Sequence, residues 1–374
     1  MPKQFTIVFD AYHLYHLPQF DPVIELMNND SRFKVVLTTA ADNKQEEIDL
    51  TQSILKSYGC ETVFAGTETE RAKKIKHLSP DVFICGWSRY KLEEYVGEKT
   101  LVAMIYHGIG IKPSYWRDNY HRLDMRFIEG PLRERQLREQ GVETDLQLTG
   151  FAKLDPLFNG ISPSREDVLK DLNLDQDKKT VLYAPTFYPS SFDKFGVSIA
   201  EQTKKYNLII KLHMWSYFLD EFAGVSLKSH RRLTKKIMNR YDHVRILPPE
   251  IYNIVPYYNA SDVLVTEASS TIYEMMALNK PVILARFYKL RLSHRLFRYR
   301  LYRKRLDTEM SKEMTEFCEE IFSPKDLEST LSMVLANPKL DNDKISHYKH
   351  DMLYKLDGKA SERILEGLLK RLTG

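Results

Sequence analysis

Short apolar segments that alternate with longer, charged ones are the feature that most limits what this chain can fold into. The first half contains seven such apolar segments, at 6–9, 34–38, 62–65, 82–85, 101–106, 125–128 and 146–149. Between them lie charged stretches such as 45–58 and 132–140, which are long enough to form crossover helices. Strands that alternate with helices are typical of a parallel, doubly wound α/β sheet.

The same pattern restarts after the turn-rich segment 159–164, which we interpret as a linker. The second set of apolar segments lies at 181–184, 208–212, 244–247, 263–266 and 282–285. We therefore predict two Rossmann-type domains that face a cleft, over 1–158 and 165–345, and a C-terminal helix within 346–374 that packs back on them. Ligands of such sheets bind beyond the carboxyl ends of the strands, so functional residues are sought there.

Composition narrows the class of protein. Hydrophobic residues make up 43% and charged residues 28%, which argues against disorder as the main state. No apolar run approaches the roughly 18 residues of a membrane span, and no signal-peptide pattern precedes the first strand. Cys60, Cys85 and Cys318 are widely spaced and form neither a CxxC pair nor a zinc motif. These features predict a cytoplasmic protein with reduced thiols.

A histidine and two glycines follow the strand predicted at 101–106, in the segment His107-Gly108-Ile-Gly-Ile-Lys112. Glycine lets the backbone turn closely around a ligand, while an imidazole and an ammonium can serve as a general base and a phosphate contact. A tight turn with a structural histidine fits the same residues, because glycine turns after strands are common. The sequence alone leaves both interpretations open.

Two strands of the second half also end in polar residues. Thr186 follows the strand at 181–184, and Lys211 and His213 end the strand at 208–212. Because side chains alternate along a strand, Lys211 and His213 point to the same side. A fixed positive charge beside an imidazole suits a pyrophosphate from which a phosphate departs. On its own this pattern does not identify a site.

The hydroxyl-rich turn after the strand at 263–266 is the strongest local signal. Glu267 is followed by Ser269-Ser270-Thr271 and then by a helix predicted over 271–278. The first backbone N–H groups of a helix and its dipole attract anions, and small hydroxyls add donors. Glu274, one turn further on, can accept hydrogen bonds from ribose hydroxyls. N-capping needs only one such hydroxyl, so three in a row favour phosphate binding.

Taken in order, these motifs resemble the CDP-glycerol glycerophosphotransferases, the teichoic-acid primase and polymerase group of GT-B-type enzymes. The matching segments are the turn at His107, Gly108 and Lys112, then 149–155 with Lys153, 183–187, 211–213, 269–270 and 280–282. Glu267 stands where this family usually has an aspartate before the serine pair.

The resemblance implies a GT-B-like fold, with an acceptor-side N-terminal domain and a nucleotide-donor-binding C-terminal domain. It implies that a CDP-alcohol, CDP-glycerol or CDP-ribitol, gives its phospho-polyol to a hydroxyl of a polymer or lipid-linked acceptor and releases CMP. His107 is expected to be the base on the attacking hydroxyl, and His213 is expected to stabilise the departing phosphate. The donor-binding residues that it implies are Lys211, Thr186, Glu267, Ser269, Ser270, Thr271 and Glu274.

Metal and cofactor needs follow from the same residues. We find no clustered carboxylates that demand a metal, so we expect no metal site and no required cofactor. A Mg²⁺ ion that accompanies the nucleotide diphosphate remains an alternative.

The net charge of +4 hides a strongly basic segment at 286–305, which holds nine Lys or Arg residues and no Asp or Glu. Basic residues interleaved with aromatic ones suit an anionic membrane surface, which predicts a peripheral location on the inner face of the membrane. They also suit a phosphate-rich acceptor polymer, whereas no nucleic-acid motif accompanies them. A solvated helix is the alternative without a function.

The sequence says least about which residues contact the acceptor. His13 lies in a loop after the first strand and can either touch the acceptor or simply belong to a packed loop. The residues that we predict to contact the acceptor or its phosphates are His13, Gly108, Lys112, Lys153, Arg295 and Arg298.

Two other classes of function fit parts of the sequence. A sugar-nucleotide GT-B glycosyltransferase or a UDP-sugar 2-epimerase would share the donor turn and Glu274. A non-catalytic protein that binds polyanions or a membrane surface would use only the basic segment. The presence of His107, His213 and the serine pair in one chain favours the phospho-polyol transferase.

Overall fold

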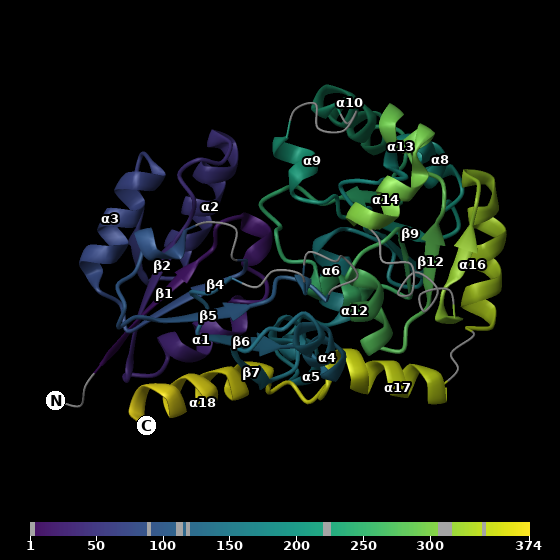
Figure 1. The fold of residues 1–374 in the computed structure, drawn as a ribbon. Helices are drawn as coiled ribbons and strands as arrows, with labels where there is room; N and C mark the ends of the chain where they lie inside the picture. Colours follow the sequence, from purple (N-terminus) through teal and green to yellow (C-terminus); the bar gives the residue numbers. More distant parts are fainter. Residues whose placement is uncertain are drawn as a thin grey trace. The chain divides into compact units, whose positions relative to one another are not determined.

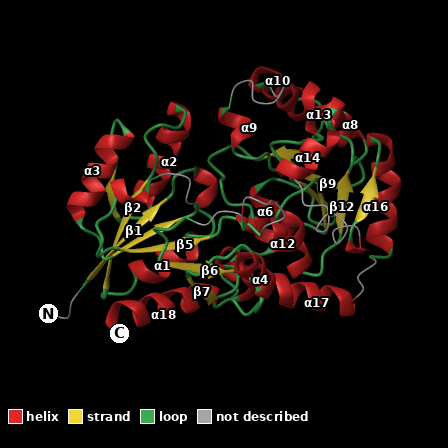
Figure 2. Ribbon diagram, viewed as in Figure 1, coloured by secondary structure: helices red, strands yellow, loops and turns green. Residues whose placement is uncertain are grey.

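The computed structural model describes residues 4–87, 91–109, 115–116, 120–219, 226–305, 316–338 and 342–374. These residues form two compact units. The first contains Met1–Ile109, Ser114–Ile161 and His350–Gly374, and the second contains Ser162–Lys349. Each unit is built on one parallel sheet, as Figures 1 and 2 show.

The first unit contains a seven-stranded sheet in the order β3-β2-β1-β4-β5-β6-β7, with every neighbouring pair parallel. Its strands are β1 Phe5–Asp10, β2 Phe33–Thr38, β3 Glu61–Val63, β4 Val82–Cys85, β5 Leu101–Ile105, β6 Met125–Ile128 and β7 Asp145–Leu148. The central strands are buried on both faces, because helices cover both sides of a doubly wound sheet. This explains the continuous apolar run of β4, whereas β6 also contains the buried Arg126.

The second unit contains a six-stranded parallel sheet in the order β10-β9-β8-β11-β12-β13. Its strands are β8 Thr180–Tyr183, β9 Asn207–Ile210, β10 Val244–Ile246, β11 Val263–Thr266, β12 Val282–Ala285 and β13 Glu319–Ile321. Relative to the first strand of the unit this is the 3-2-1-4-5-6 order of dinucleotide-binding sheets.

Helices connect the strands in both units. Those of the first unit are α1 Asp21–Asn28, α2 Gln45–Ser57, α3 Glu68–Leu78, α4 Pro131–Glu139, α5 Asp155–Phe158 and α18 Ala360–Thr373. Those of the second unit are α6 Arg165–Asp171, α7 Phe192–Phe195, α8 Ser198–Glu201, α9 Trp215–Phe218, α10 Leu227–Met238, α11 Val255–Ala260, α12 Thr271–Ala277, α13 Leu292–Leu296, α14 Arg298–Arg305 and α16 Leu327–Ala336. A further helix, α17, covers Asn342–Leu353. Over the described residues, no helix is both long and apolar enough to cross a membrane.

The predicted fold class, two doubly wound parallel sheets, is confirmed. Every predicted strand is present, with bounds that differ by two residues at most. The sequence did not reveal β13, because it has only three residues and two of them are glutamates. β13 is an edge strand and pairs with β12 alone, so it does not need to be apolar along its length.

The C-terminal segment differs from the prediction of one helix. The chain forms α17 and α18, and the six residues between them include Tyr354 (φ 57°) and Gly358 (φ 70°). Positive φ angles end a right-handed helix, so the single helix predicted from the amphipathic pattern was too long. A side chain at Gly358 would lie 2.8 Å from the backbone nitrogen of Asn159, so only glycine fits there. The second of these helices, α18, packs on α1 in the first unit.

In each sheet the first three strands are added in one direction across the sheet, and the fourth and later strands are added in the other direction, starting beside the first strand. These switch points lie between β1 and β4 in the first unit and between β8 and β11 in the second. Loops that leave a switch point in opposite directions leave a crevice at the carboxyl ends of the strands, and ligands bind there. Both sets of candidate residues lie at these strand ends.

Candidate functional site

A cluster of imidazole and aromatic rings lies at the carboxyl ends of β1, β4 and β5. His13 and His16 come from the loop after β1, Trp87 follows β4, and His107 follows β5. The ring of His16 lies 5.3 Å from that of Trp87 and 4.7 Å from that of His107, measured between centroids. The rings of Tyr15 and His107 are 5.4 Å apart. The first switch point is therefore filled by side chains that can exchange protons and stack.

His107 is held in one tautomer by the backbone. Its Nδ1 lies 2.9 Å from the carbonyl oxygen of Gly86, and a carbonyl can only accept. Nδ1 therefore carries a proton, and in the neutral ring Nε2 is the basic nitrogen. A side chain at Gly86 would lie 3.0 Å from the His16 ring, so glycine is needed for the close packing of these two residues. The glycine of the predicted turn, Gly108, is buried.

His13 pairs with a carboxylate that the sequence did not point to. Its Nδ1 lies 3.1 Å from Oε1 of Glu47, a residue of α2, and both side chains are buried. The backbone N–H of Leu14 donates to the same oxygen at 3.4 Å. The structure therefore places His13 in the ring cluster, against His16 and Trp87, while the predicted contact with an acceptor stays a prediction. Glu47, His16 and Gly86 carry no local sequence signal, because their partners lie on other segments.

Glu267 joins β11 to the loop after β8 in the second unit. It is fully buried, and its Oε2 accepts a hydrogen bond of 2.5 Å from the backbone N–H of Thr186. Its Oε1 accepts from the backbone N–H of Ser191 at 2.8 Å and from the Ser191 hydroxyl. Burial raises the pKa of Glu267 to about 7, although these hydrogen bonds favour the charged form. Its carboxyl group thus shapes the loop at the second switch point.

Lys211 and His213 lie beyond the end of β9. Lys211 is buried, and its Nζ lies 3.5 Å from the carbonyl oxygen of Leu212 and 3.4 Å from Sδ of Met214. His213 is half-buried, and its Nδ1 accepts a hydrogen bond of 3.2 Å from the backbone N–H of Trp215. An accepting Nδ1 is unprotonated, so Nε2 carries the proton. His213 is therefore fixed in the tautomer opposite to that of His107.

The hydroxyl of the N-cap residue of α12 is not used to cap the helix. Ser270 is the N-cap residue and makes no side-chain capping hydrogen bond, whereas Thr67, Ser164 and Ser226 cap other helices in that way. Ser269 accepts a hydrogen bond of 3.3 Å from the N–H of Thr271, and the Thr271 hydroxyl is buried with no partner among the described residues. This weakens the capping interpretation that the sequence left open.

Glu274 lies inside the second unit. Its side chain is fully buried, and its Oε2 accepts a hydrogen bond of 2.6 Å from the hydroxyl of Tyr258 on α11. The predicted ribose contact of Glu274 stays a prediction. Lys280, from the predicted Lys-Pro motif, donates to the carbonyl oxygens of Tyr258 and Asn259 at 2.8 and 2.9 Å, so it holds the end of α11.

The motif at 149–155 ends in a structural aspartate. Asp155 accepts hydrogen bonds from the backbone N–H groups of Ala360 and Ser361 at 3.0 and 2.7 Å, and from the Ser361 hydroxyl at 2.6 Å. It therefore anchors the start of α18. Lys153 is buried in the same segment, and Lys112 lies outside the described residues.

The basic segment forms two short helices, α13 and α14, not one. His294 is buried, where its Nδ1 lies 2.9 Å from the hydroxyl of Tyr188 and its Nε2 lies 2.8 Å from Nη2 of Arg291. Arg295 and Arg298 are exposed. Four large apolar side chains on the segment are also exposed, namely Leu292, Leu296, Phe297 and Tyr299.

Among the basic residues of this segment whose side chains the structure describes, two have acidic partners outside the segment, which the sequence could not reveal. Arg286 pairs with Glu320, and Lys289 pairs with Asp193 at 3.0 Å. The net positive charge at the surface of this segment is therefore smaller than its number of Lys and Arg residues indicates. Within the described parts of the chain, no group of three or more His, Cys, Asp or Glu side chains is arranged to hold a metal ion.

Comparison with solved structures places the fold. The structure is similar to a wall teichoic acid polymerase, TagF, with a TM-score of 0.66 and 15% identity over 99% of this chain and 90% of that one. It is also similar to a putative UDP-N-acetylglucosamine 2-epimerase from Listeria monocytogenes, with a TM-score of 0.63 and 12% identity over 100% and 97% of the two chains. At these identities the likeness concerns the fold alone.

Sequence comparison goes further. The chain is 25% identical over 229 residues to a teichoic acid glycerol-phosphate transferase of Staphylococcus aureus, which covers 59% of this chain and 54% of that protein. It thus spans about half the length of this curated relative. The family model described as CDP-Glycerol:Poly(glycerophosphate) glycerophosphotransferase matches residues 140–370, more than half of the chain. The chain therefore belongs to the CDP-glycerol:poly(glycerophosphate) glycerophosphotransferase family.

Proposed function

We propose that this chain transfers glycerol phosphate from CDP-glycerol to a hydroxyl of a polymer or lipid-linked acceptor and releases CMP. CDP-ribitol is the alternative donor. The observation that carries the proposal is the set of strand ends around β8. Lys211 and His213 follow β9, Glu267 shapes the loop after β8, and the hydroxyls of Ser270 and Thr271, which do not cap α12, follow β11. A cation, a fixed N–H donor and small hydroxyls together suit a pyrophosphate.

The first unit supplies the base in this proposal. The acceptor hydroxyl attacks the phosphorus that carries glycerol, and its proton passes to Nε2 of His107. The hydrogen bond from Nδ1 to Gly86 keeps Nε2 in the basic form and stabilises the imidazolium that results. No second base is needed for this step.

The second unit handles the leaving group. As the new oxygen–phosphorus bond forms, the bond from that phosphorus to the bridging oxygen breaks, and CMP leaves with this oxygen. The N–H at Nε2 of His213 is proposed to donate to the phosphate that departs, and Lys211 adds positive charge. The hydroxyls of Ser269, Ser270 and Thr271 hold the pyrophosphate. Phosphoryl transfer depends mainly on such positioning and charge stabilisation.

A nucleotide-release assay tests the proposal. The protein is incubated with CDP-glycerol, CDP-ribitol or UDP-N-acetylglucosamine, with and without EDTA, and CMP, UMP and UDP are measured. We expect CMP only, and we expect His107→Ala and His213→Ala to lower its rate by about 100-fold or more. His121→Ala and His347→Ala change exposed histidines and serve as matched controls. Release of UDP would contradict the proposal in favour of a sugar-nucleotide enzyme. Loss of activity in EDTA would show that a metal accompanies the donor.

We also propose that α13 and α14 bind an anionic membrane surface, where a lipid-linked acceptor would be found. Exposed Leu292, Leu296 and Phe297 can enter the headgroup region, while Arg295 and Arg298 pair with anionic lipids. The proposal depends on both the apolar and the basic side chains, because each contributes separately to binding.

Vesicle sedimentation tests the membrane proposal. We expect the protein to bind vesicles that contain phosphatidylglycerol, less so with added salt, and not to bind phosphatidylcholine alone. The double variant Arg295→Glu, Arg298→Glu should bind at least about 10-fold more weakly. Arg231→Glu, Arg232→Glu makes the same charge change at exposed residues of α10 and should bind like the native protein. Equal binding of both double variants to the vesicles would overturn the proposal. If the native protein binds a polyanionic polymer but not the vesicles, the basic segment binds the acceptor polymer and not the membrane.

A further inference from the structure

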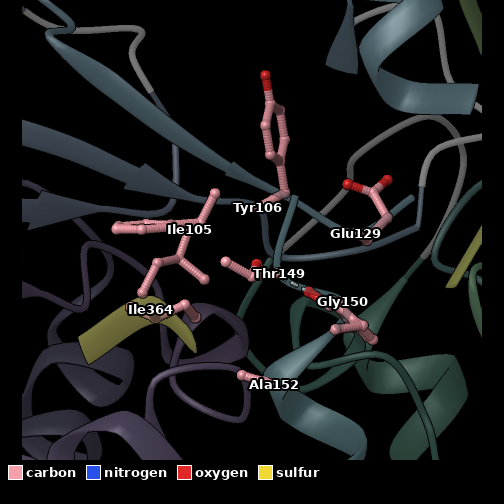
Figure 3. Close-up of a pocket in the computed structure, with 9 residues that line it drawn as sticks. Ile105, Tyr106, Glu129, Thr149, Gly150, Ala152 and Ile364 are labelled. Atoms are coloured by element: carbon pink, nitrogen blue, oxygen red, sulfur yellow. Dashed lines mark hydrogen bonds between the residues drawn. The ribbon is translucent and has the colours of Figure 1, made fainter. Parts of the chain in front are cut away.

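Two sets of side chains adjoin the strand ends that carry the proposed site residues. In the first unit, Tyr106 and Glu129 help to line a small pocket, which has room for about one water-sized group (Figure 3). In the second unit, side chains of the basic segment 286–305 pack on the segments that follow β8 and β9. The pocket is too small for a glycerol phosphate. The basic segment, in contrast, contacts the parts of the chain that carry Thr186 and His213.

His294 of α13 holds Tyr188 in the loop after β8, and both side chains are buried. Nη2 of Arg291 lies 2.8 Å from Nε2 of His294, and a guanidinium can only donate, so Nε2 accepts and Nδ1 carries the proton. Nδ1 therefore donates to the hydroxyl oxygen of Tyr188 at 2.9 Å. The same oxygen accepts a hydrogen bond of 3.3 Å from the backbone N–H of Arg291. Two donors of the basic segment thus bind one hydroxyl of this loop.

Apolar side chains join the same two parts of the chain. Leu301 of α14 is buried in a cluster with Phe187 and Tyr188. Leu290 of the basic segment and Trp215 of α9 pack against this cluster. Side chains that are buried together keep close to one arrangement, because a shift of one opens a cavity beside another. The basic segment is therefore fixed to the loop by apolar packing as well as by hydrogen bonds.

Glu267 and the basic segment hold different residues of this loop. Glu267 accepts hydrogen bonds from the backbone N–H groups of Thr186 and Ser191 at 2.5 and 2.8 Å. Tyr188 lies between these two residues in the chain and is held by His294 instead. The conformation of the loop thus depends on both attachments.

Two rings of this cluster adjoin His213. The centroids of the Phe187 and Trp215 rings lie 6.0 and 5.8 Å from that of the His213 ring and 5.5 Å from each other. The backbone N–H of Trp215 also donates to Nδ1 of His213 and so sets its tautomer. A shift of Phe187 or Trp215 therefore changes where Nε2 of His213 points. This is the nitrogen that donates to the departing phosphate in the proposed function.

We infer that Tyr188 and His294 are positioning residues for the transfer reaction. Through their hydrogen bond the basic segment keeps the rings of Phe187 and Trp215 in place against His213. Neither Tyr188 nor His294 exchanges a proton or touches the reacting atoms in this role. A displacement of about 1 Å at a reacting group can cost about 100-fold in rate, so loss of this hydrogen bond should lower kcat. The inference rests on the proposed function, since it concerns the orientation of His213 in the same reaction.

Removal of one hydroxyl tests the inference, with CDP-glycerol as donor and the octyl ester of glycerol 3-phosphate as acceptor. Tyr188→Phe keeps the ring but removes the oxygen to which His294 donates. We expect kcat for CMP release to fall about 10-fold, with an unchanged acceptor KM. In the His213→Ala background Tyr188→Phe should lower kcat no further, because the side chain that it orients is absent. Tyr206→Phe removes a hydroxyl that lies 3.3 Å from the Ser332 hydroxyl in the same unit, and it should keep the native kcat.

Substitutions of His294 separate orientation from folding. Asparagine has an amide that can take the place of Nδ1, so His294→Asn can still donate to Tyr188 and should retain most of the native kcat. His294→Leu has no donor, and its kcat should fall as that of Tyr188→Phe does. If Tyr188→Phe unfolds on thermal analysis, these two variants provide the same comparison. An equal fall of kcat in the native and His213→Ala backgrounds, or no fall in the native background, would overturn the inference. Absence of CMP release by the native protein would instead overturn the proposed function.

Discussion

The Nδ1 atom of His107 donates a hydrogen bond of 2.9 Å to the carbonyl oxygen of Gly86. Gly86 follows β4 and His107 follows β5, the neighbouring strand of the same sheet. One peptide carbonyl thus decides which imidazole nitrogen is basic. The same glycine leaves the space that His16 occupies against the His107 ring.

Gly86→Ala should lower activity without loss of donor binding. The added methyl group would lie 3.0 Å from the His16 ring, so either the ring or the carbonyl must move, and His107 loses its orientation. We expect kcat for CMP release to fall about 10-fold or more, with the KM for CDP-glycerol unchanged. Gly97→Ala is the control, because a methyl group there meets nothing within 4 Å. An unaltered kcat for Gly86→Ala would contradict the proposed role of its carbonyl.

Thr271→Val should weaken donor binding but not the fold. The hydroxyl of Thr271 is buried without a partner among the described residues, so its replacement by a methyl group of similar size should not lower the free energy of unfolding. If the hydroxyl binds the pyrophosphate, the KM for CDP-glycerol should rise about 5- to 10-fold. Steady-state kinetics and thermal unfolding of the same sample measure both. An unchanged KM would remove Thr271 from the donor site.

The buried carboxyl of Glu267 should make stability depend on pH. Burial raises its pKa to about 7, so the folded protein binds this proton more tightly than the unfolded chain does. The resulting stabilisation is complete below about pH 4.5 and is lost as the pH rises to about 7, by about 3 kcal/mol at most. Urea unfolding of native protein and Glu267→Gln across this range measures it.

The Glu267→Gln variant should lose that part of the pH dependence. Glu250→Gln, at an exposed glutamate, should retain the native profile. A native free energy of unfolding that does not fall between pH 4.5 and 7, once corrected with Glu267→Gln, would show that Glu267 has an ordinary pKa.

Asp155→Ala should destabilise the first unit through α18. The substitution removes hydrogen bonds to the backbone of Ala360 and Ser361 and to the Ser361 hydroxyl. Loss of a helix cap of this kind costs about 2 kcal/mol, so the urea midpoint should fall and amide exchange in α18 should accelerate. Asp177→Ala, at an exposed loop residue, should leave both unchanged. Native-like exchange in α18 would show that Asp155 is not its anchor.

The sequence by itself determined the fold class and the positions of the strands. Buried parallel strands must be apolar along their whole length, and their ends must carry the polar residues that contact ligands, so both appear as local patterns. It also determined that His107, His213 and the turn Ser269-Ser270-Thr271 lie at strand ends. The sequence did not predict the short edge strand β13 or the break between α17 and α18, because neither has a distinct hydrophobic period.

Only the tertiary structure decided what these residues contact. Gly86 lies 21 residues before His107, Glu47 lies 34 after His13, and Ser191 lies 76 before Glu267. Crossover helices bring such segments together at one edge of a sheet, and no local pattern records the pairing. The tautomer of His107 and the hydrogen bonds of buried Glu267 follow from these distant contacts, whereas the tautomer of His213 is set locally by the backbone N–H of Trp215.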